Sequence, residues 1–194
     1  MTGTLHITGD PNADELLSSD PLALLIGMLL DQQVPMETAF AGPLKIRERL
    51  GAFDAATIAK ESPEAFVEIF KTSPAVHRFP GSMAERVQGL CAALVERWDG
   101  DAAAVWTRDA PDGPEILTRL LALPGFGAQK AKIFLALLGK QYGLDATGWR
   151  EAAGPYGEEG SLRSVADIVD PESLAQVRAA KQAVKAAAKR AKAG

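Results

Sequence analysis

The chain has 194 residues, of which 47% are apolar and 24% charged, and its formal net charge at pH 7 is −4. This is enough chain for a sizeable core in one or two small domains, and the composition is that of an ordinary globular protein. Alanine and leucine abound and only 6% of the residues are aromatic, which favours an all-α fold. Because Cys91 is the single cysteine, an intramolecular disulfide and a four-cysteine iron–sulfur cluster are both excluded.

The charges are unevenly distributed along the chain. No acidic residue follows Glu172, whereas six basic residues do: Arg178, Lys181, Lys185, Lys189, Arg190 and Lys192. The rest of the chain carries 15 basic against 25 acidic residues, so an acidic body near −10 precedes a basic tail near +6. An acidic body repels nucleic acid except where local basic groups overcome it.

Two features of the hydropathy pattern argue against export and against membrane insertion. Residues 1–10 contain no basic region followed by an apolar run, so no signal peptide is expected. The longest apolar run, Leu22–Leu30, is too short to span a bilayer. We therefore expect a cytoplasmic protein.

Capped amphipathic segments predict helices along most of the chain. Asp20 and Pro21 form a helix start before a run, 22–32, that is apolar on nearly every side, which predicts a helix in the centre of the core. A helix opened by Pro35 should run to residue 50 with an interruption at Gly42-Pro43. Further helices are expected at 13–18, 53–60, 62–70, 82–98, 114–122, 128–138, 147–153 and from 171 onward. Cys91 lies within the apolar stripe of the 82–98 segment, so a buried thiol is expected.

The segment 123–131, Leu-Pro-Gly-Phe-Gly-Ala-Gln-Lys-Ala, separates two of these helices. Its proline cannot continue the first helix, and its two glycines allow backbone angles that a side chain forbids. This predicts a tight hairpin that presents free backbone N–H groups at the start of the second helix, where an anion is favoured. The alternative is an ordinary helical hairpin with a glycine turn.

The pattern Leu-Pro-Gly-x-Gly-x-x-x-Ala resembles the helix-hairpin-helix of the DNA-repair glycosylases in the endonuclease III, MutY and 3-methyladenine glycosylase superfamily, known as HhH-GPD. The resemblance implies that the hairpin grips a DNA phosphate, with contacts from Gly125, Phe126, Gly127, Gln129 and Lys130. It also implies a monovalent cation, Na⁺ or K⁺, held by backbone carbonyls, here those of Leu121, Leu123 and Phe126. No other cofactor is implied, and some relatives carry an iron–sulfur cluster that this chain cannot form.

The stretch Leu29-Leu30-Asp31-Gln32-Gln33 resembles the family segment in which a glutamine inserts into the duplex in place of the damaged base. Gln33 or Gln32 would have that role, and two solvated glutamines at a helix end are the alternative. His77-Arg78 lies in a loop where relatives often have a basic or aromatic pair facing DNA; a solvated loop pair is the alternative.

The segment 144–150, Leu-Asp-Ala-Thr-Gly-Trp-Arg, resembles the family motif Val-Asp-Thr-His-x-x-Arg. Asp145 and Arg150 match that motif, and the resemblance implies that Arg150 contacts DNA. Thr147 and Gly148 do not match, and the spacing from Gln129 to Asp145 is shorter than in the family. The family aspartate drives cleavage of the N-glycosidic bond, because a fixed carboxylate stabilises the positive charge left on the sugar. Asp145 is therefore the expected catalytic residue, and a simple helix cap is the alternative.

Glycosylases of this superfamily that also nick the strand use a lysine two residues after the second hairpin glycine. Gln129 occupies that position and cannot form a Schiff base, whereas Lys130 is rotated by ~100° around the helix. We therefore expect a monofunctional enzyme with water as nucleophile.

Together these features imply an all-α, HhH-GPD-like fold in which two lobes flank a DNA-binding cleft. The glycosylase-like domain would comprise residues 1–170, with lobes 35–122 and 13–34 plus 123–170, followed by a basic tail, 171–194. The implied protein is a nucleoid-associated monomer whose partner is duplex DNA with a damaged or mismatched base. A non-catalytic DNA- or protein-binding module that retains the fold is the alternative.

Overall fold

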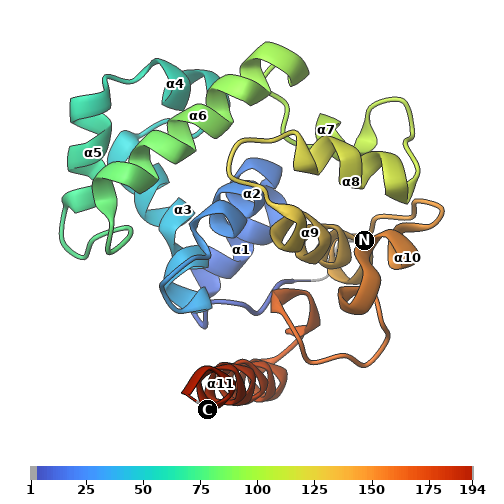
Figure 1. Cartoon of the computed structure of the whole chain (residues 1–194). Coiled ribbons are helices and arrows are strands. Elements are labelled where there is room, and N and C mark those ends of the chain that lie inside the picture. Colours follow the sequence, from blue (N-terminus) through green and yellow to red (C-terminus); the bar gives the residue numbers. More distant parts are fainter. Residues whose placement is uncertain (1–3, 194) are drawn as a thin grey trace.

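The computed structural model describes residues 4–193 and consists of helices joined by short connections (Figure 1). No strand occurs in this range, so the all-α expectation is confirmed. Residues 1–3 and 194, the outermost parts of the two expected domains, lie outside the described residues. The α-helices are α1 (Pro11–Ser19), α2 (Pro21–Leu30), α3 (Met36–Leu50), α4 (Ala55–Lys60), α5 (Pro63–Lys71), α6 (Pro80–Trp98), α7 (Ala104–Thr107), α8 (Gly113–Leu121), α9 (Ala128–Gln141), α10 (Trp149–Ala153) and α11 (Pro171–Ala193). Two 3₁₀ turns, η1 (Gly154–Tyr156) and η2 (Val165–Asp167), follow α10.

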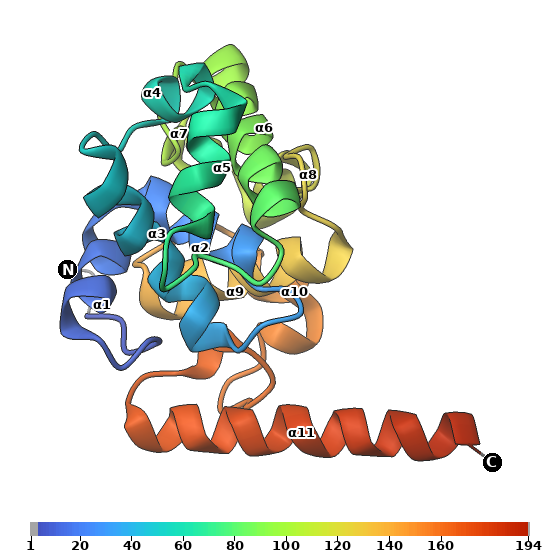
Figure 2. The same cartoon turned by 90° about the vertical axis from the view of Figure 1, so that its left-hand side faces the viewer.

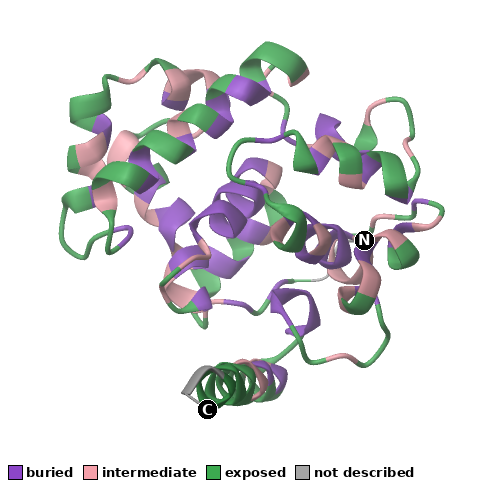
Figure 3. Cartoon of the chain, viewed as in Figure 1, coloured by how far each residue is buried: buried purple, intermediate pink, exposed green. Residues whose placement is uncertain are grey.

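Helix α2 is the centre of the fold, as its composition predicts. The Asp20 side chain caps its first turn, and every residue from Leu22 to Leu30 is buried (Figure 3). Glycines let α3 approach closely: a Cβ on Gly27 would lie 2.6 Å from the Phe40 ring, and one on Gly42 would lie 2.6 Å from Leu30. Burial on all sides fixes the position of the C-terminal end of α2, which leads directly into the segment 31–35.

The expected interruption at Gly42-Pro43 does not occur, because α3 continues through Pro43 to Leu50. Proline removes one backbone N–H and crowds the preceding turn, which costs about 3 kcal/mol in an isolated helix. Here Gly42 and Pro43 are both buried, and Gly42 lies against Leu30 of α2, so the packing of the helix offsets that cost.

Helices α4 and α5 pack on α6, which forms one side of the molecule (Figures 1 and 2). Cys91 is buried in the apolar face of α6, as expected, and burial raises the pKa of its thiol to about 12. The helix begins at Pro80, earlier than Ser82, with Phe79 as its N-cap.

Helices α8 and α9 form the predicted hairpin, and α10 packs against both. Helix α8, which the expected lobe 35–122 includes, packs against α7, α9 and α10, and the division into two lobes stays a prediction. The buried apolar side chains of the described residues form one continuous core. No described helix is both long enough and apolar enough to cross a membrane.

Helix α11 lies along the outside of the body, and its C-terminal part extends beyond it (Figure 2). It is anchored at its start, where Val177 is fully buried and the Asp170 side chain caps the first turn by accepting the Ser173 N–H. From Gln182 to Ala191 every residue is exposed, as the lack of an apolar stripe predicts.

Candidate functional site

A groove of about 1510 Å³ opens between the α2–α3 corner, the first turns of α9, the segment 155–163 and one side of α11. Polar and charged side chains come from all four parts. They include Asp31, Gln32, Gln33, Glu37, Gln129, Lys130, Glu158, Glu159, Arg163, Arg178, Lys181 and Lys185, and Arg78 is added by the loop before α6. The groove thus brings the glutamine segment next to the second hairpin helix, although about a hundred residues separate them in sequence.

The two candidate glutamines differ in how they are held. The Gln32 side chain donates to the Leu29 carbonyl at 3.1 Å and accepts from Arg86 Nη1 at 3.1 Å. Its backbone carbonyl lies 3.0 Å from His77 Nε2, and burial lowers the pKa of that histidine. The contacts of Gln32 therefore stabilise the connection between α2 and α3, and His77 belongs to the same hydrogen-bond network.

Gln33 is exposed and has a backbone φ of +58°, in the left-handed region that side chains seldom adopt. Such strain persists only where the surrounding structure imposes it, and it is concentrated at functional positions. Of the two candidate glutamines, Gln33 is therefore the one whose side chain is exposed, and its insertion into a duplex stays a prediction.

Lys130 does not extend to the hairpin loop. Its Nζ donates to the Leu29 carbonyl at 2.8 Å, at the C-terminal end of α2, where a cation is favoured. Burial lowers the pKa of its ammonium to about 8; Asp31 opposes this shift and Arg86 adds to it. In this structure the ammonium thus joins α9 to α2, and the phosphate contact of Lys130 stays a prediction.

Asp31 follows the last residue of α2, and 13% of its side chain is exposed, toward the groove. Its carboxylate accepts no hydrogen bond from any described residue, and its nearest cation is Lys181 Nζ at 3.9 Å. Burial raises the pKa of this carboxyl, while Lys181, Lys130 and Lys185 oppose the rise. The groove therefore contains a mostly buried carboxylate held by charge alone. Its position next to Gln33 is the only sequence signal that could have singled it out.

The hairpin loop itself has the predicted backbone. Gly125 has a φ of +82°, and a Cβ there would lie 2.3 Å from the Leu29 side chain, so this glycine packs on α2. A Cβ on Gly127 would meet nothing within 4 Å, which leaves the start of α9 open to a ligand. The Phe126 ring is buried edge-on against Phe134, so only its backbone can face DNA.

The monovalent cation at this loop stays a prediction. Of the three carbonyls implied, that of Leu123 accepts the Phe126 N–H at 3.2 Å, which engages one of its two lone pairs. Leu121 is exposed at the surface of α8.

Gln129 is exposed at the groove, where its amide donates to the Tyr156 hydroxyl at 3.1 Å. Tyr156 comes from η1, which carries no family motif, so no sequence signal singles it out. This contact joins the first turn of α9 to the segment 155–163.

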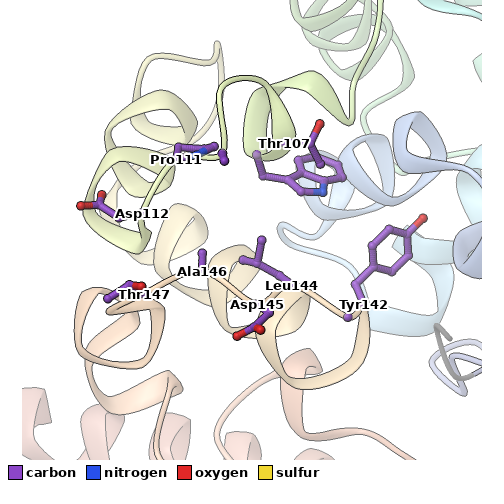
Figure 4. Close-up of a pocket in the computed structure, with 11 residues that line it drawn as sticks. Thr107, Pro111, Asp112, Tyr142, Leu144, Asp145, Ala146 and Thr147 are labelled. Atoms are coloured by element: carbon purple, nitrogen blue, oxygen red, sulfur yellow. The ribbon is translucent and has the colours of Figure 1, made fainter.

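Asp145 lies at the other end of the hairpin. It follows the last turn of α9, a helix of 14 residues or ~20 Å, whereas the groove residues occupy the first turns. Its exposed carboxylate lines a separate pocket of about 430 Å³ on the stretch between Tyr142 and Thr147 (Figure 4). The expectation that Asp145 faces the hairpin across one cleft is therefore wrong. Asp145 is four residues past the end of α9, and four residues span at most ~14 Å, which is less than the length of the helix.

Arg150 also lies away from the groove. Its Nη1 donates to the Gly157 carbonyl at 3.0 Å, and its guanidinium stacks on Trp149 at 4.4 Å from the ring centre. These contacts assign it to holding α10 against η1, so its predicted DNA contact does not share a site with the hairpin.

Helix α11 contributes cations to the opposite edge of the groove. Arg178 forms an ion pair with Glu37 of α3, and Lys181 approaches Asp31. Lys185, one turn further on, also lines the groove. The sequence predicted these basic charges but not that acidic side chains of the body would hold them.

Comparisons of this chain with protein-family models, with curated proteins and with solved structures found no match.

Proposed function

We propose that this protein is a monofunctional DNA glycosylase that hydrolyses the N-glycosidic bond of a damaged or mismatched base in duplex DNA. In this proposal the groove receives the nucleotide that is flipped out of the duplex. Enzymes that act on a base inside a duplex must extrude it into such a pocket.

The observation that carries the proposal is the composition of the groove. An exposed glutamine on strained backbone, Gln33, stands beside a mostly buried carboxylate and faces the first turns of the hairpin helix. The glutamine is suited to fill the gap left by the extruded base, and the carboxylate to balance the charge on the sugar. The open N–H groups at the start of α9, next to Gly127, offer an anion site for the DNA backbone.

Water is the nucleophile in this proposal. Gln129 occupies the position of the lysine in strand-nicking relatives and is hydrogen-bonded to Tyr156. The Lys130 ammonium is hydrogen-bonded to the Leu29 carbonyl. Neither side chain supplies a free amine to the sugar.

The test is a screen of duplexes that each carry one defined lesion or mismatch. After incubation, abasic sites are revealed by alkali, which cleaves the strand only where a base has left. We expect base release from at least one lesion, an intact strand before alkali, and no covalent adduct on borohydride treatment. An adduct would identify a lysine nucleophile and contradict the monofunctional assignment.

A non-catalytic DNA-binding module is the second candidate. The placement of Asp145 outside the groove favours it, because the aspartate that matches the family motif cannot act there. Selective binding of a lesion duplex without base release from any member of the screen would establish this second function.

A further inference from the structure

We propose that Asp31 is the catalytic carboxylate of this protein and takes the role that the family motif gives to Asp145. This inference rests on the proposed glycosylase function and names the group that acts on the sugar. Three observations support it: the set of acidic side chains that line the groove, the cations that neutralise each of them, and the rigidity of the backbone that carries each one.

Four acidic residues of the described chain line the groove, and three of them are poorly suited to the task. Glu158 and Glu159 are exposed, so water screens their charge, and Glu158 also lies 3.6 Å from Arg163. Glu37 is engaged in an ion pair with Arg178 in the first turn of α3. Asp31 remains, with a shielded carboxylate that accepts no hydrogen bond from the described residues.

The position of Asp31 is rigid. It ends α2, the most buried helix of the fold, and its backbone N–H donates to the Met28 carbonyl at 3.3 Å. The next residue, Gln32, is fixed by Leu29, Arg86 and His77. The backbone that carries this carboxylate is therefore fixed, which limits the reorganisation needed when charge develops near it, as electrostatic catalysis requires.

Asp31 is also two residues before Gln33. A glutamine that enters the duplex at the gap places the extruded sugar on the groove side of the same corner, next to the Asp31 carboxylate. In the reaction, the C1′–N bond breaks with its electron pair on the base, and the oxygen of water bonds to C1′. The proton released by that water passes through Asp31 to the departing base, so atoms and charge balance without a further reagent.

The amines around Asp31 fit this role. Lys130 is anchored on the Leu29 carbonyl, and Lys181 stands 3.9 Å away on α11, at the edge of the groove. Bound DNA offers phosphates to Lys181 and Lys185, which draws these cations from the carboxylate to the strand. Lys130 remains on the Leu29 carbonyl and continues to favour the ionised form of Asp31, which then faces the sugar.

The first test measures affinity and does not depend on turnover. Two duplexes are compared, one with a positively charged pyrrolidine in place of the sugar and one with a neutral tetrahydrofuran. We expect the wild-type protein to prefer the charged duplex by roughly tenfold or more. Asp31→Asn, which keeps the size of the side chain, should abolish the preference, and Asp31→Glu should restore part of it. Asp145→Asn should keep it.

The second test uses the lesion found in the screen. Asp31→Asn should slow base release by roughly 100-fold or more, whereas Asp145→Asn should act at the wild-type rate. Circular dichroism of each variant checks that the helices are intact.

The outcomes that would contradict the two proposals are distinct. A wild-type protein without preference for the charged duplex, or an Asp31→Asn variant that keeps the preference, overturns the role of Asp31. Loss of the preference in Asp145→Asn would return that role to the motif residue. If the preference depends on Asp31 but no lesion is processed, Asp31 faces the sugar as inferred and the hydrolytic function is wrong.

Discussion

Gly125→Ala tests whether the hairpin is held on the end of α2 in the way that brings the groove together. Gly125 has a φ of +82°, and a methyl group there would lie 2.3 Å from Leu29 Cδ1. Alanine in the left-handed region costs about 1–2 kcal/mol, and forcing a methyl group into a packed site costs about 1–3 kcal/mol more. We expect the free energy of unfolding to fall by about 2–5 kcal/mol.

For a chain of this length, each kcal/mol lowers the melting temperature by roughly 2–4 °C, so Gly125→Ala should lower it by roughly 4–20 °C. The assay is thermal unfolding followed by circular dichroism. Gly127→Ala is the matched control, because its backbone has a φ of −75° and its Cβ would meet nothing within 4 Å. The control should change the melting temperature by only a degree or two.

A double-mutant cycle identifies the contact. Leu29→Ala removes the atom that the new methyl group would strike, at the cost of a buried leucine. If the steric reasoning holds, Gly125→Ala costs less in the Leu29→Ala background than in the wild type. Equal melting temperatures for the Gly125 and Gly127 variants, or strictly additive effects in the cycle, would refute the packing of the hairpin on α2.

Three further predictions concern the groove. Gln33→Ala should weaken binding of a lesion duplex by roughly three- to tenfold and leave the melting temperature unchanged, whereas Gln32→Ala should lower the free energy of unfolding by about 1–2 kcal/mol. DNA titrations and thermal melts measure both effects, and the reverse result would exchange the roles of the two glutamines. Deleting the residues after Arg178 should reduce the slope of log affinity against log salt concentration by ~0.9 for each phosphate that the tail no longer neutralises. Fluorescence anisotropy measures the DNA affinity, and an unchanged slope would show that α11 does not contact the DNA. Because burial lowers the pKa of Lys130 from 10.5 to about 8 in the folded protein, the unfolded chain binds this proton more tightly, and the free energy of unfolding of the wild type relative to Lys130→Met should rise between pH 8 and 10.5. Denaturant titrations measure this, and a difference in unfolding free energy that stays constant with pH would contradict the burial of the ammonium.

Local signals predicted most of the fold. Asp20 with Pro21 marks the start of α2, and the proline and glycines at 124–127 mark the hairpin; both work through backbone geometry within a few residues. The uninterrupted course of α3 through Pro43 was not predictable in this way. It depends on the close contact of Gly42 with Leu30, a residue of a different helix.

The site was harder to predict because it depends on side-chain direction and on the return path of the chain. Lys130 lies within the hairpin motif, yet its ammonium binds a carbonyl about a hundred residues away in sequence. Asp145 matches a motif, but the segment after α9 is too short to bring it back to the groove. Asp31 has no motif of its own, and only the fold reveals that its carboxylate is shielded and turned toward Lys130 and Lys181.

The ion pairs between α11 and the body affect how this protein would search a genome. Arg178 and Lys181 already lie next to Glu37 and Asp31, so contact with the phosphates of an undamaged duplex would only replace one set of anions around these cations by another. Its net electrostatic gain is therefore small, and residence on ordinary sequence would be brief. A site where a base leaves the stack easily adds the contacts of the flipped nucleotide, which undamaged DNA does not supply. If the proposed glycosylase function holds, the acidic body would favour selectivity for lesions over tight binding to DNA in general.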